Sequence, residues 1–478
     1  MLGLWLLILC AGSIFLPLRT GPLFVDDAYI TFRYAENISD GAGFVYNPGE
    51  KVLGTTTPLY TLLLAALHKI GIGTLAAAGG LGIAFSFMAA ILVFLILRHF
   101  GRPELGMASS LLLCVLSPWT LAALSGMETT LYASLLLLAF LLFLEKKYGA
   151  AAVGAGLATL TRPDGIALAA VLLPFILVRG RKPALSFLLG YILTVSPRLI
   201  FTWAYFGSAI PQTVIVKKLI HPEPWWLVLG EFGRRFIDHP GLACTSALFV
   251  AGLAAVGFIR RELLPAAIWI LVYIAGYAAA QVLTIGFPWY FAALVPFYIV
   301  VSAAGIDLLL TRWPLRWKWL IPLPLVIVAA LYLGPAVRAR QQEMRMRESA
   351  YKKIALWILR GSAPGDKIYA GEIGALGYYL KNRYIIDSSG LISRAVYDLR
   401  KKDKDELVRA DPDAKWFFEG TPWWSWEVIV RYKPDYITSR AIWLHLPTLA
   451  RTREFQARYE KISDPGLQVG GNVVYKRK

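Results

Sequence analysis

Long apolar runs separated by short polar segments dominate the first two thirds of the chain. They lie near residues 1–18, 57–98, 104–122, 127–144, 149–161, 164–178, 184–206, 241–259, 263–285, 289–310 and 319–335. A helix that crosses a bilayer needs about 20 mainly apolar residues, and most of these runs approach that length. The pattern therefore predicts a polytopic α-helical membrane protein with about eleven transmembrane helices.

Three of these runs do not correspond simply to one span each. The run 57–98 is too long, and its glycines predict a short interfacial helix from Pro58, followed by a span from about residue 75 to 98. The runs 149–161 and 164–178 are individually short. They form either two short spans or a re-entrant pair.

The chain becomes polar and charged after residue 335. Strand-like stretches such as "KIYAGE" and "RYIIDS" alternate there with helical ones such as "EMRMRESAYKKIALWILRG". That alternation predicts a small α/β domain. We therefore expect two domains, a transmembrane domain over 1–335 and a soluble α/β domain over 336–478.

Basic residues in alternate loops predict the orientation. One set of loops holds Arg98, Arg102, Lys146, Lys147, Arg179, Arg181, Lys182, Arg260, Arg261, Arg312, Arg316 and Lys318, whereas the opposing short loops contain only Arg162. The positive-inside rule assigns the first set to the cytoplasm. The N-terminus is then cytoplasmic, and the outer loop 19–57, the second outer loop 207–240 and the C-terminal domain are extracytoplasmic.

Composition supports a membrane protein and argues against nucleic-acid binding. Hydrophobic residues make up 57% of the chain and charged residues 17%, with a mean hydropathy of +0.55. Of the formal charge of +18, the tail from Pro335 onward holds +10, from 27 Lys/Arg against 17 Asp/Glu, and much of the remaining +8 lies in short loops whose basic residues set topology and contact anionic lipid head groups. Cys10, Cys114 and Cys244 lie inside apolar runs and have neither disulfide nor metal-ligand spacing.

The first outer loop holds the strongest candidates for chemistry. "DDAYITFRYAENI" predicts a helix at the membrane surface, with Asp26 and Asp27 at its N-terminus and Arg33 on the same face as Asp26. Helix capping would explain one acid. Two adjacent acids beside a cation at the lipid boundary instead favour an active site.

The segment that begins with this pair resembles the first outer loop of C-type (GT-C) glycosyltransferases, especially the branch that contains mycobacterial terminal arabinofuranosyltransferases. The resemblance covers "DDAYITFRYAENISDGAGFVYNPGEKVLGTTTPLYTLLLAAL". It continues in family order with "SGMETTLY", "LTRPDG", "YFGSAIPQTVIVK" and "GEIGALGYYLKNRYIIDSSGL". It implies a GT-C-like transmembrane domain in the bacterial cell (inner) membrane.

The resemblance also implies an activity. Such a chain would be an inverting glycosyltransferase that moves a sugar from a polyprenyl-phosphate donor to an extracytoplasmic glycan or lipid acceptor. Asp26 or Asp27 would act as general base on the acceptor hydroxyl, and the sequence does not rank the two. The sugar stays open between hexose and pentose.

A lipid-phosphate leaving group requires cations near the membrane surface. The candidates are Arg33, Arg162, Lys217 and Lys218. Lys217 lies just beyond a span end, where it either binds phosphate or snorkels toward lipid head groups. Arg162 either binds phosphate or pairs with Asp164 or Glu128.

A second carboxylate and a metal are also considered. Glu128 is a second active-site acid, a metal ligand or a charge at a helix N-terminus. A divalent metal could use Asp26, Asp27 and Glu128 together with His221 or His239, but their spacing is no ligand pattern. The metal requirement is therefore left open.

Two tryptophan clusters are candidate sugar contacts. Trp225 and Trp226 belong either to a sugar platform or to the aromatic belt at the membrane interface. Trp423 and Trp424 either pack in the core of the C-terminal domain or contact an acceptor glycan.

The rival functions are a secondary transporter or lipid flippase and a non-catalytic subunit with the same fold. Many spans and buried charges suit a transporter as well. Repeated halves are not evident in the sequence, and the C-terminal domain is unusual for that class, so the sequence favours the enzyme.

Overall fold

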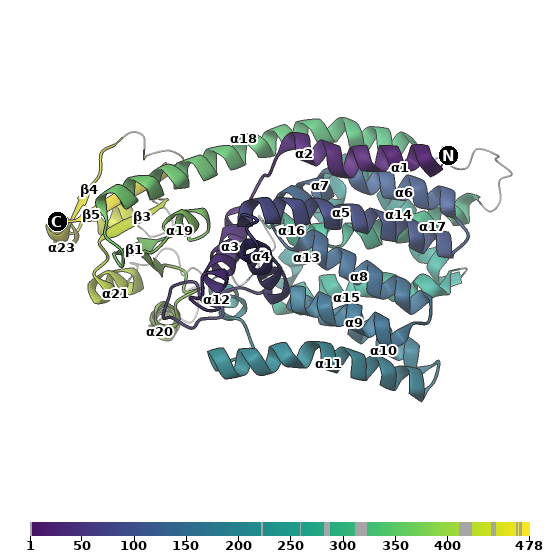
Figure 1. The fold of residues 1–478 in the computed structure, drawn as a ribbon, viewed down its shortest axis with the longest axis horizontal. Helices are drawn as coiled ribbons and strands as arrows, with labels where there is room; N and C mark the ends of the chain where they lie inside the picture. Colours follow the sequence, from purple (N-terminus) through teal and green to yellow (C-terminus); the bar gives the residue numbers. More distant parts are fainter. Residues whose placement is uncertain are drawn as a thin grey trace.

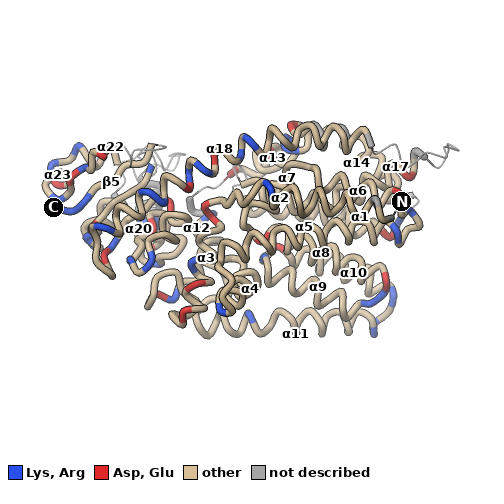
Figure 2. Tube along the Cα trace, turned by 45° about the horizontal axis from the view of Figure 1, so that its top comes forward, with Lys and Arg blue, Asp and Glu red and all other residues tan. Residues whose placement is uncertain are grey.

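The structure is a computed structural model, and it describes residues 2–220, 223–258, 260–281, 287–310, 323–410, 423–440, 446–464, 467 and 471–478. A bundle of roughly parallel and antiparallel helices forms the larger part, and a small α/β domain lies at one end of it (Figure 1). The charged positions gather toward the two ends of the molecule, and few lie along the middle of the bundle helices (Figure 2). This distribution suits helices whose middle parts face lipid.

The bundle is built from apolar helices of different lengths. They are α1 (Leu2–Cys10), η1 (Ala11–Phe15), α2 (Leu16–Thr20), α5 (Thr74–His99), α6 (Pro103–Val115), α7 (Ser117–Leu124), α8 (Thr129–Leu144), α9 (Tyr148–Thr161), η2 (Pro163–Gly165), α10 (Ile166–Leu177), α11 (Arg181–Phe206), α14 (Pro240–Phe258), η3 (Arg261–Leu263), α15 (Leu264–Ala280), α16 (Pro288–Ala292) and α17 (Val295–Leu310).

The described helices include four that are long and apolar enough to cross a membrane, within Thr74–His99, Arg181–Phe206, Arg261–Ala280 and Pro288–Leu308. A fifth would be the pair α6 and α7, which is bent by 61°. Several further apolar helices are shorter. The prediction of a polytopic helical protein is therefore confirmed, whereas the count of eleven spans is not.

α11 shows how the bundle meets lipid. It runs along one edge of the bundle (Figure 1), and Leu193 and Ile200 are 70% and 67% exposed. A soluble protein rarely exposes a continuous apolar helix of this kind. Together with the long apolar helices, this face indicates an integral membrane protein.

The two unusual stretches of the sequence form separate helices. The run 57–98 divides into α4 (Pro58–Lys69) and α5, as predicted. The runs 149–161 and 164–178 become α9 and α10, joined by the 3-10 turn η2. Whether α9 and α10 each span the membrane or form a re-entrant pair stays open.

Three further helices lie at the end of the bundle that faces the α/β domain. They are α3 (Asp26–Ser39), α12 (Gln212–Ile220) and α13 (Trp225–Asp238). The 39-residue α18 (Leu323–Gly361) runs along the bundle and continues into the α/β domain (Figure 1). The expected domain boundary at residues 335 and 336 falls inside this continuous helix, so the division into domains stays a prediction.

The α/β domain contains a five-stranded sheet in the order β2-β1-β3-β5-β4. β1 (Lys367–Ala370) pairs in parallel with β2 (Tyr384–Asp387) and β3 (Tyr436–Arg440). β5 (Asn472–Arg477) pairs antiparallel with β3 and with β4 (Tyr459–Lys461). The helices of the domain are α19 (Ala375–Tyr379), α20 (Arg394–Ala410), α21 (Trp423–Tyr432), α22 (Leu446–Leu449) and α23 (Arg453–Arg458).

Neighbouring side chains of β1 are buried on opposite faces of the sheet. Ile368 belongs to the same buried cluster as Ile354 of α18, whereas Tyr369 belongs to a cluster with Val396 and Val428 of α20 and α21. Successive strand residues point to opposite faces, so a strand covered on both sides reads as a continuous apolar run. The sheet is therefore held between α18 on one side and α20 and α21 on the other.

Candidate active site

Asp26 and Asp27 begin α3, but neither occupies its N-cap position. Val25 is the N-cap residue and makes no side-chain capping bond. The Asp26 carboxylate instead accepts hydrogen bonds from the backbone N–H groups of Gly374 at 3.0 Å and Ala375 at 2.8 Å. Asp26 therefore accepts backbone N–H bonds, as a capping residue does, but the donors belong to the α/β domain, 348 residues further along the chain.

The environment of Asp26 favours its neutral form. Burial and then the nearby carboxylates of Glu372 and Asp27 raise its pKa to about 7, against the lowering effect of the two backbone N–H donors. Removing a carboxylate from water disfavours its charge, and like charges nearby add to that cost. Both oxygens of Asp26 are already engaged, so the side chain is committed to the contact with the α/β domain.

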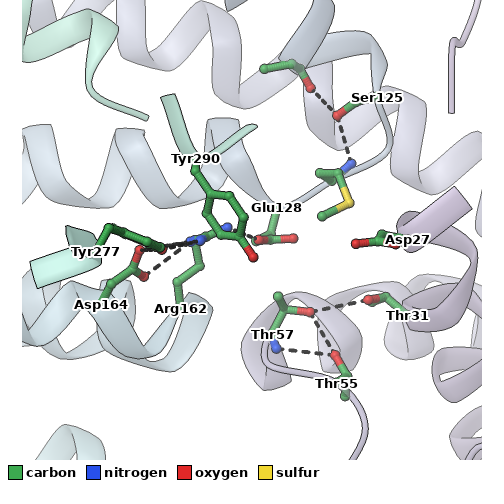
Figure 3. A network of polar contacts seen from close by, with 12 residues as sticks. Asp27, Thr31, Thr55, Thr57, Ser125, Glu128, Arg162, Asp164, Tyr277 and Tyr290 are labelled. Carbon is green, nitrogen blue, oxygen red and sulfur yellow. Dashed lines mark hydrogen bonds and ion pairs between the residues drawn. The ribbon is translucent and has the colours of Figure 1, made fainter. Parts of the chain in front are cut away.

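Asp27 points to a different part of the site. Its Oδ2 lies 4.0 Å from Nζ of Lys217, and its side chain is 33% exposed. In Figure 3 it extends from the start of α3 toward the carboxylate of Glu128. Asp27 thus combines partial solvent access with a nearby cation.

Lys217 comes from α12, at the edge of the bundle. Its Nζ donates to the hydroxyl of Tyr290 at 3.0 Å and lies 5.1 Å from the ring centre of Phe287. Burial lowers its pKa, but Tyr290 and Asp27 outweigh this effect, so the net shift is upward. The ammonium group therefore stays charged beside Asp27. The side chain of Lys218, the neighbouring candidate for phosphate binding, lies outside the described residues.

Arg162 lies in a buried ionic cluster next to Asp27 (Figure 3). Its Nη1 donates to Glu128 at 2.7 Å, and its Nε donates to Asp164 at 3.2 Å. Its Nη2 donates to the hydroxyl of Tyr277 at 2.9 Å, and that hydroxyl donates to Asp164 at 2.6 Å. Both acids that sequence analysis offered as alternative partners therefore bind Arg162, which favours the structural interpretation over phosphate binding.

The hydrogen bonds of Arg33, by contrast, go to groups other than Lys217 and Asp27. It is only 6% exposed, and its donors reach the carbonyl oxygens of Tyr46 at 2.9 Å, Gly377 at 2.5 Å and Arg383 at 2.9 Å. Its guanidinium also lies over the Tyr46 ring. These bonds use the donors that a phosphate would need, so the geometry places Arg33 in the interface with the α/β domain rather than in a phosphate site.

Sequence analysis missed several polar groups near Asp27. The hydroxyl oxygens of Thr57 and Thr31 lie 3.4 Å apart, and Thr55 lies 3.1 Å from Thr57 (Figure 3). The run "TTT" at 55–57 lies within the segment that carried the resemblance, so its three hydroxyl groups could have been predicted as part of the site. Tyr277 and Tyr290 were hidden in apolar runs, where an aromatic residue normally indicates core packing.

Of the tryptophan candidates, the structure describes the side chains of Trp225 and Trp226. Trp225 and Trp226 are 57% and 59% exposed at the start of α13, which suits the aromatic belt. The side chains of Trp423 and Trp424 lie outside the described residues.

No metal cluster is evident in the part of the chain that the structure describes. There, no three His, Cys, Asp or Glu side chains are grouped so as to hold a metal ion. Nε2 of His239 lies 2.6 Å from the hydroxyl of Ser117, and His221 lies outside the described residues.

Solved structures with the same architecture include known glycosyltransferases. ArnT from Cupriavidus metallidurans, solved with undecaprenyl phosphate, matches with a TM-score of 0.65 over 99% of this chain and 97% of that chain, at 14% identity. The archaeal oligosaccharyltransferase AglB from Archaeoglobus fulgidus, solved with an inhibitory peptide and a dolichol-phosphate, matches with a TM-score of 0.56 over 99% and 74%, at 12% identity. The chain has the GT-C fold.

The arabinofuranosyltransferase AftD from Mycobacteria shares this GT-C fold with a TM-score of 0.50, covering 99% of this chain and 40% of that one at 13% identity. Residues 335–475 match a family described as a domain of unknown function (DUF8728). No curated protein matches the chain by sequence. The GT-C fold and the resemblance to this class of enzyme, both predicted from the sequence, are confirmed.

Proposed function

We propose that this chain is an inverting glycosyltransferase that moves a sugar from a polyprenyl-phosphate donor to an extracytoplasmic glycan or lipid acceptor. The observation that carries the proposal is the pairing of Asp27 with Lys217 at the end of the apolar bundle, 4.0 Å apart. Structures with the same fold support the donor class, since ArnT was solved with undecaprenyl phosphate and AglB with a dolichol-phosphate.

Asp27 is the general base in this proposal, and Lys217 contacts the phosphate of the donor. Asp27 removes the proton from an acceptor hydroxyl while that oxygen attacks the anomeric carbon. The bond between the anomeric carbon and the phosphate oxygen breaks, and the polyprenyl phosphate leaves with the electron pair. Attack from the side opposite the leaving group inverts the configuration, and the Lys217 ammonium stabilises the negative charge that develops on the phosphate.

The cluster around Arg162 shapes the site beside these two groups. Its Nη1, Nε and Nη2 donate to Glu128, Asp164 and the hydroxyl of Tyr277, so Arg162 has a neutralising role rather than a phosphate-binding one. Tyr290 connects the two parts, because it accepts from Lys217 and its ring lies 4.9 Å from the Arg162 guanidinium. In this arrangement Glu128 is paired with Arg162, so its charge is neutralised beside Asp27.

The test is a transfer assay with the purified full-length chain in lipid nanodiscs. A panel of radiolabelled polyprenyl-phosphate sugars is offered together with extracts of envelope glycans and lipids, and the anomeric configuration of any product is determined. We expect release of polyprenyl phosphate coupled to formation of a glycoside with inverted configuration.

A parallel experiment with proteoliposomes addresses the transporter or flippase alternative. Here the movement of an intact labelled polyprenyl-phosphate sugar across the bilayer is measured in the absence of acceptor. Movement of the intact lipid without any glycoside product in the nanodisc assay would contradict the proposed activity and favour the flippase.

A further inference from the structure

The α/β domain contacts the first outer loop through residues 371–383, which we call the docking segment, and through further hydrogen bonds from Tyr384 to Glu50 and between Ile385 and Asn47. It lies between β1 and β2, contains α19, and includes the glycine-spaced motif "GEIGALGYYL". α3 and α19 pack side by side, and Figure 1 shows both at the junction between the bundle and the α/β domain. The motif has no role in the proposed chemistry, and its contacts explain its composition.

Hydrogen bonds join the docking segment to α3 and to the loop after it. The Asp26 carboxylate accepts from the N–H groups of Gly374 and Ala375, and the Arg33 guanidinium donates to the carbonyls of Gly377 and Arg383. The Arg33 contact involves an ionised side chain and backbone carbonyls, which form stronger hydrogen bonds than neutral pairs and fix direction as well as distance.

Aromatic and acidic side chains add further bonds of the same kind. The hydroxyl of Tyr46 donates to the carbonyl of Ile373 at 2.5 Å, and the hydroxyl of Tyr378 donates to Oε1 of Glu36 at 2.6 Å. Lys381 forms an ion pair with the same Glu36. The contacts therefore begin at the first turn of α3 and continue through the loop after the helix.

Two glycines of the motif are required by these contacts. A Cβ atom at Gly374 would collide with the backbone oxygen of Asp26, and one at Gly377 would collide with the hydroxyl of Tyr46. Glycine at both positions lets the backbone of the docking segment approach the loop closely enough to form the hydrogen bonds. Their spacing is thus explained by a close contact between two parts of the same chain.

We propose that the docking segment is a working part of the active site, and that it sets the position of Asp27 through the contact made by Asp26. Asp26 is a positioning residue in this account, and Asp27, its neighbour in the first turn of α3, is the catalytic residue. The proposal rests on the proposed function for the identity of the base. In this account the C-terminal domain holds the start of α3 in a fixed position relative to Lys217.

The first test compares three substitutions at Asp26. Asn and Ser accept hydrogen bonds from backbone N–H groups, as they do at helix N-caps, whereas Ala does not. We expect Asp26→Ala to lower kcat by about 10²-fold with little change in the donor KM, because a displacement of about 1 Å in a reacting group has an effect of that size. Asp26→Asn and Asp26→Ser should keep kcat within about tenfold of wild type, since each retains an acceptor.

The outcomes separate positioning from catalysis. If Asp26 were the base, Asn, Ser and Ala would abolish transfer alike, and the proposal would be overturned. Wild-type activity of Asp26→Ala would overturn it as well. Asp40→Asn, which changes an exposed acid at the other end of α3, is the matched control and should leave kcat unchanged.

The second test measures the contact itself and does not depend on activity. Gly374→Ala and Gly377→Ala should accelerate amide hydrogen exchange over residues 26–47. Gly233→Ala, at a position with no atom within 4 Å of the added Cβ, should leave exchange unchanged. Tyr378→Phe removes only the hydroxyl that donates to Glu36 and provides a milder variant should the glycine variants fail to fold.

The two tests distinguish failure of this inference from failure of the proposed function. Unchanged exchange over residues 26–47 in Gly377→Ala and in Tyr378→Phe would overturn the docking role, whatever the activity. Altered exchange in a chain that transfers no sugar at all would leave the docking contact standing and overturn the proposed function, and with it the positioning role of Asp26.

Discussion

Replacing Lys217 by Gln tests the proposed phosphate contact. Lys217 Nζ lies 4.0 Å from Asp27 Oδ2, and a Coulomb interaction at that distance is about 4 kcal/mol at an effective dielectric constant of about 20. Asp27 is a third exposed, so solvent screens this interaction. A contact of Lys217 with a lipid phosphate is better compared with a hydrogen bond to a charged group, which contributes about 1.5–3 kcal/mol.

This range corresponds to a loss of about 10- to 150-fold in kcat/KM for the donor. Part of the loss should fall on kcat, because the charge on the leaving phosphate develops during the reaction. The assay is steady-state transfer with variable polyprenyl-phosphate sugar, together with binding of polyprenyl phosphate itself. Glutamine is uncharged but still donates a hydrogen bond, so the comparison isolates the charge.

A matched control comes from α4. Lys69→Gln removes an exposed lysine at the end of that helix, and kcat/KM should not change. If Lys217→Gln bound polyprenyl phosphate as tightly as the wild type and transferred sugar at the same rate, Lys217 would not be the phosphate ligand, and the reasoning from its distance to Asp27 would be refuted.

Three further predictions concern the groups around the site. Arg162→Met should destabilise the protein by about 3–5 kcal/mol, measured by thermal unfolding, because it leaves the buried Glu128 and the partly buried Asp164 without their cation. Arg33→Lys should not restore the stability lost in Arg33→Met, because an ammonium group cannot reach the three separate carbonyls, and equal melting temperatures for Lys and wild type would contradict this. The pKa of Asp26 is raised from 3.8 to about 7, so the native state holds this proton more tightly than the unfolded state and Asp26's contribution to stability falls as pH rises from about 4 to 7. Asp26→Asn lacks that dependence, so its melting temperature should improve relative to wild type between pH 5 and pH 7.5, and a constant difference would refute the assignment.

Much of the fold follows from local pattern. The division of residues 57–98 into α4 and α5 was predicted from the length of the apolar run and its glycines. The helix that begins at Asp26 was predicted from the segment that follows a short apolar stretch, and the α/β character of the C-terminal domain from alternating strand-like and helical stretches. These features depend on interactions between residues close in sequence. The number of spans does not, because helices such as α9 and α10 are too short for length alone to decide whether they cross the membrane.

The site was predictable only in part, because its contacts join distant parts of the chain. The sequence places Asp26 and Asp27 side by side and offers no means to rank them, whereas the structure separates them by the directions of their side chains. Arg33 was expected at the phosphate because it shares a helical face with Asp26, but its partners are carbonyls that include Gly377, 344 residues away. No pattern among neighbouring residues predicts such a contact. Only the glycine spacing around Gly377 indicates that another part of the chain approaches the backbone closely there.

The central claim is that Asp27 is the base of a sugar transfer. The most direct measurement is the rate of transfer from the cognate polyprenyl-phosphate sugar by purified Asp27→Asn, with Asp40→Asn as the matched control on the same helix. Asparagine keeps the size of the side chain but cannot take the proton, so the account predicts a loss of at least about 10²-fold in kcat for Asp27→Asn and no loss for the control. Transfer by Asp27→Asn at the wild-type rate would contradict the account.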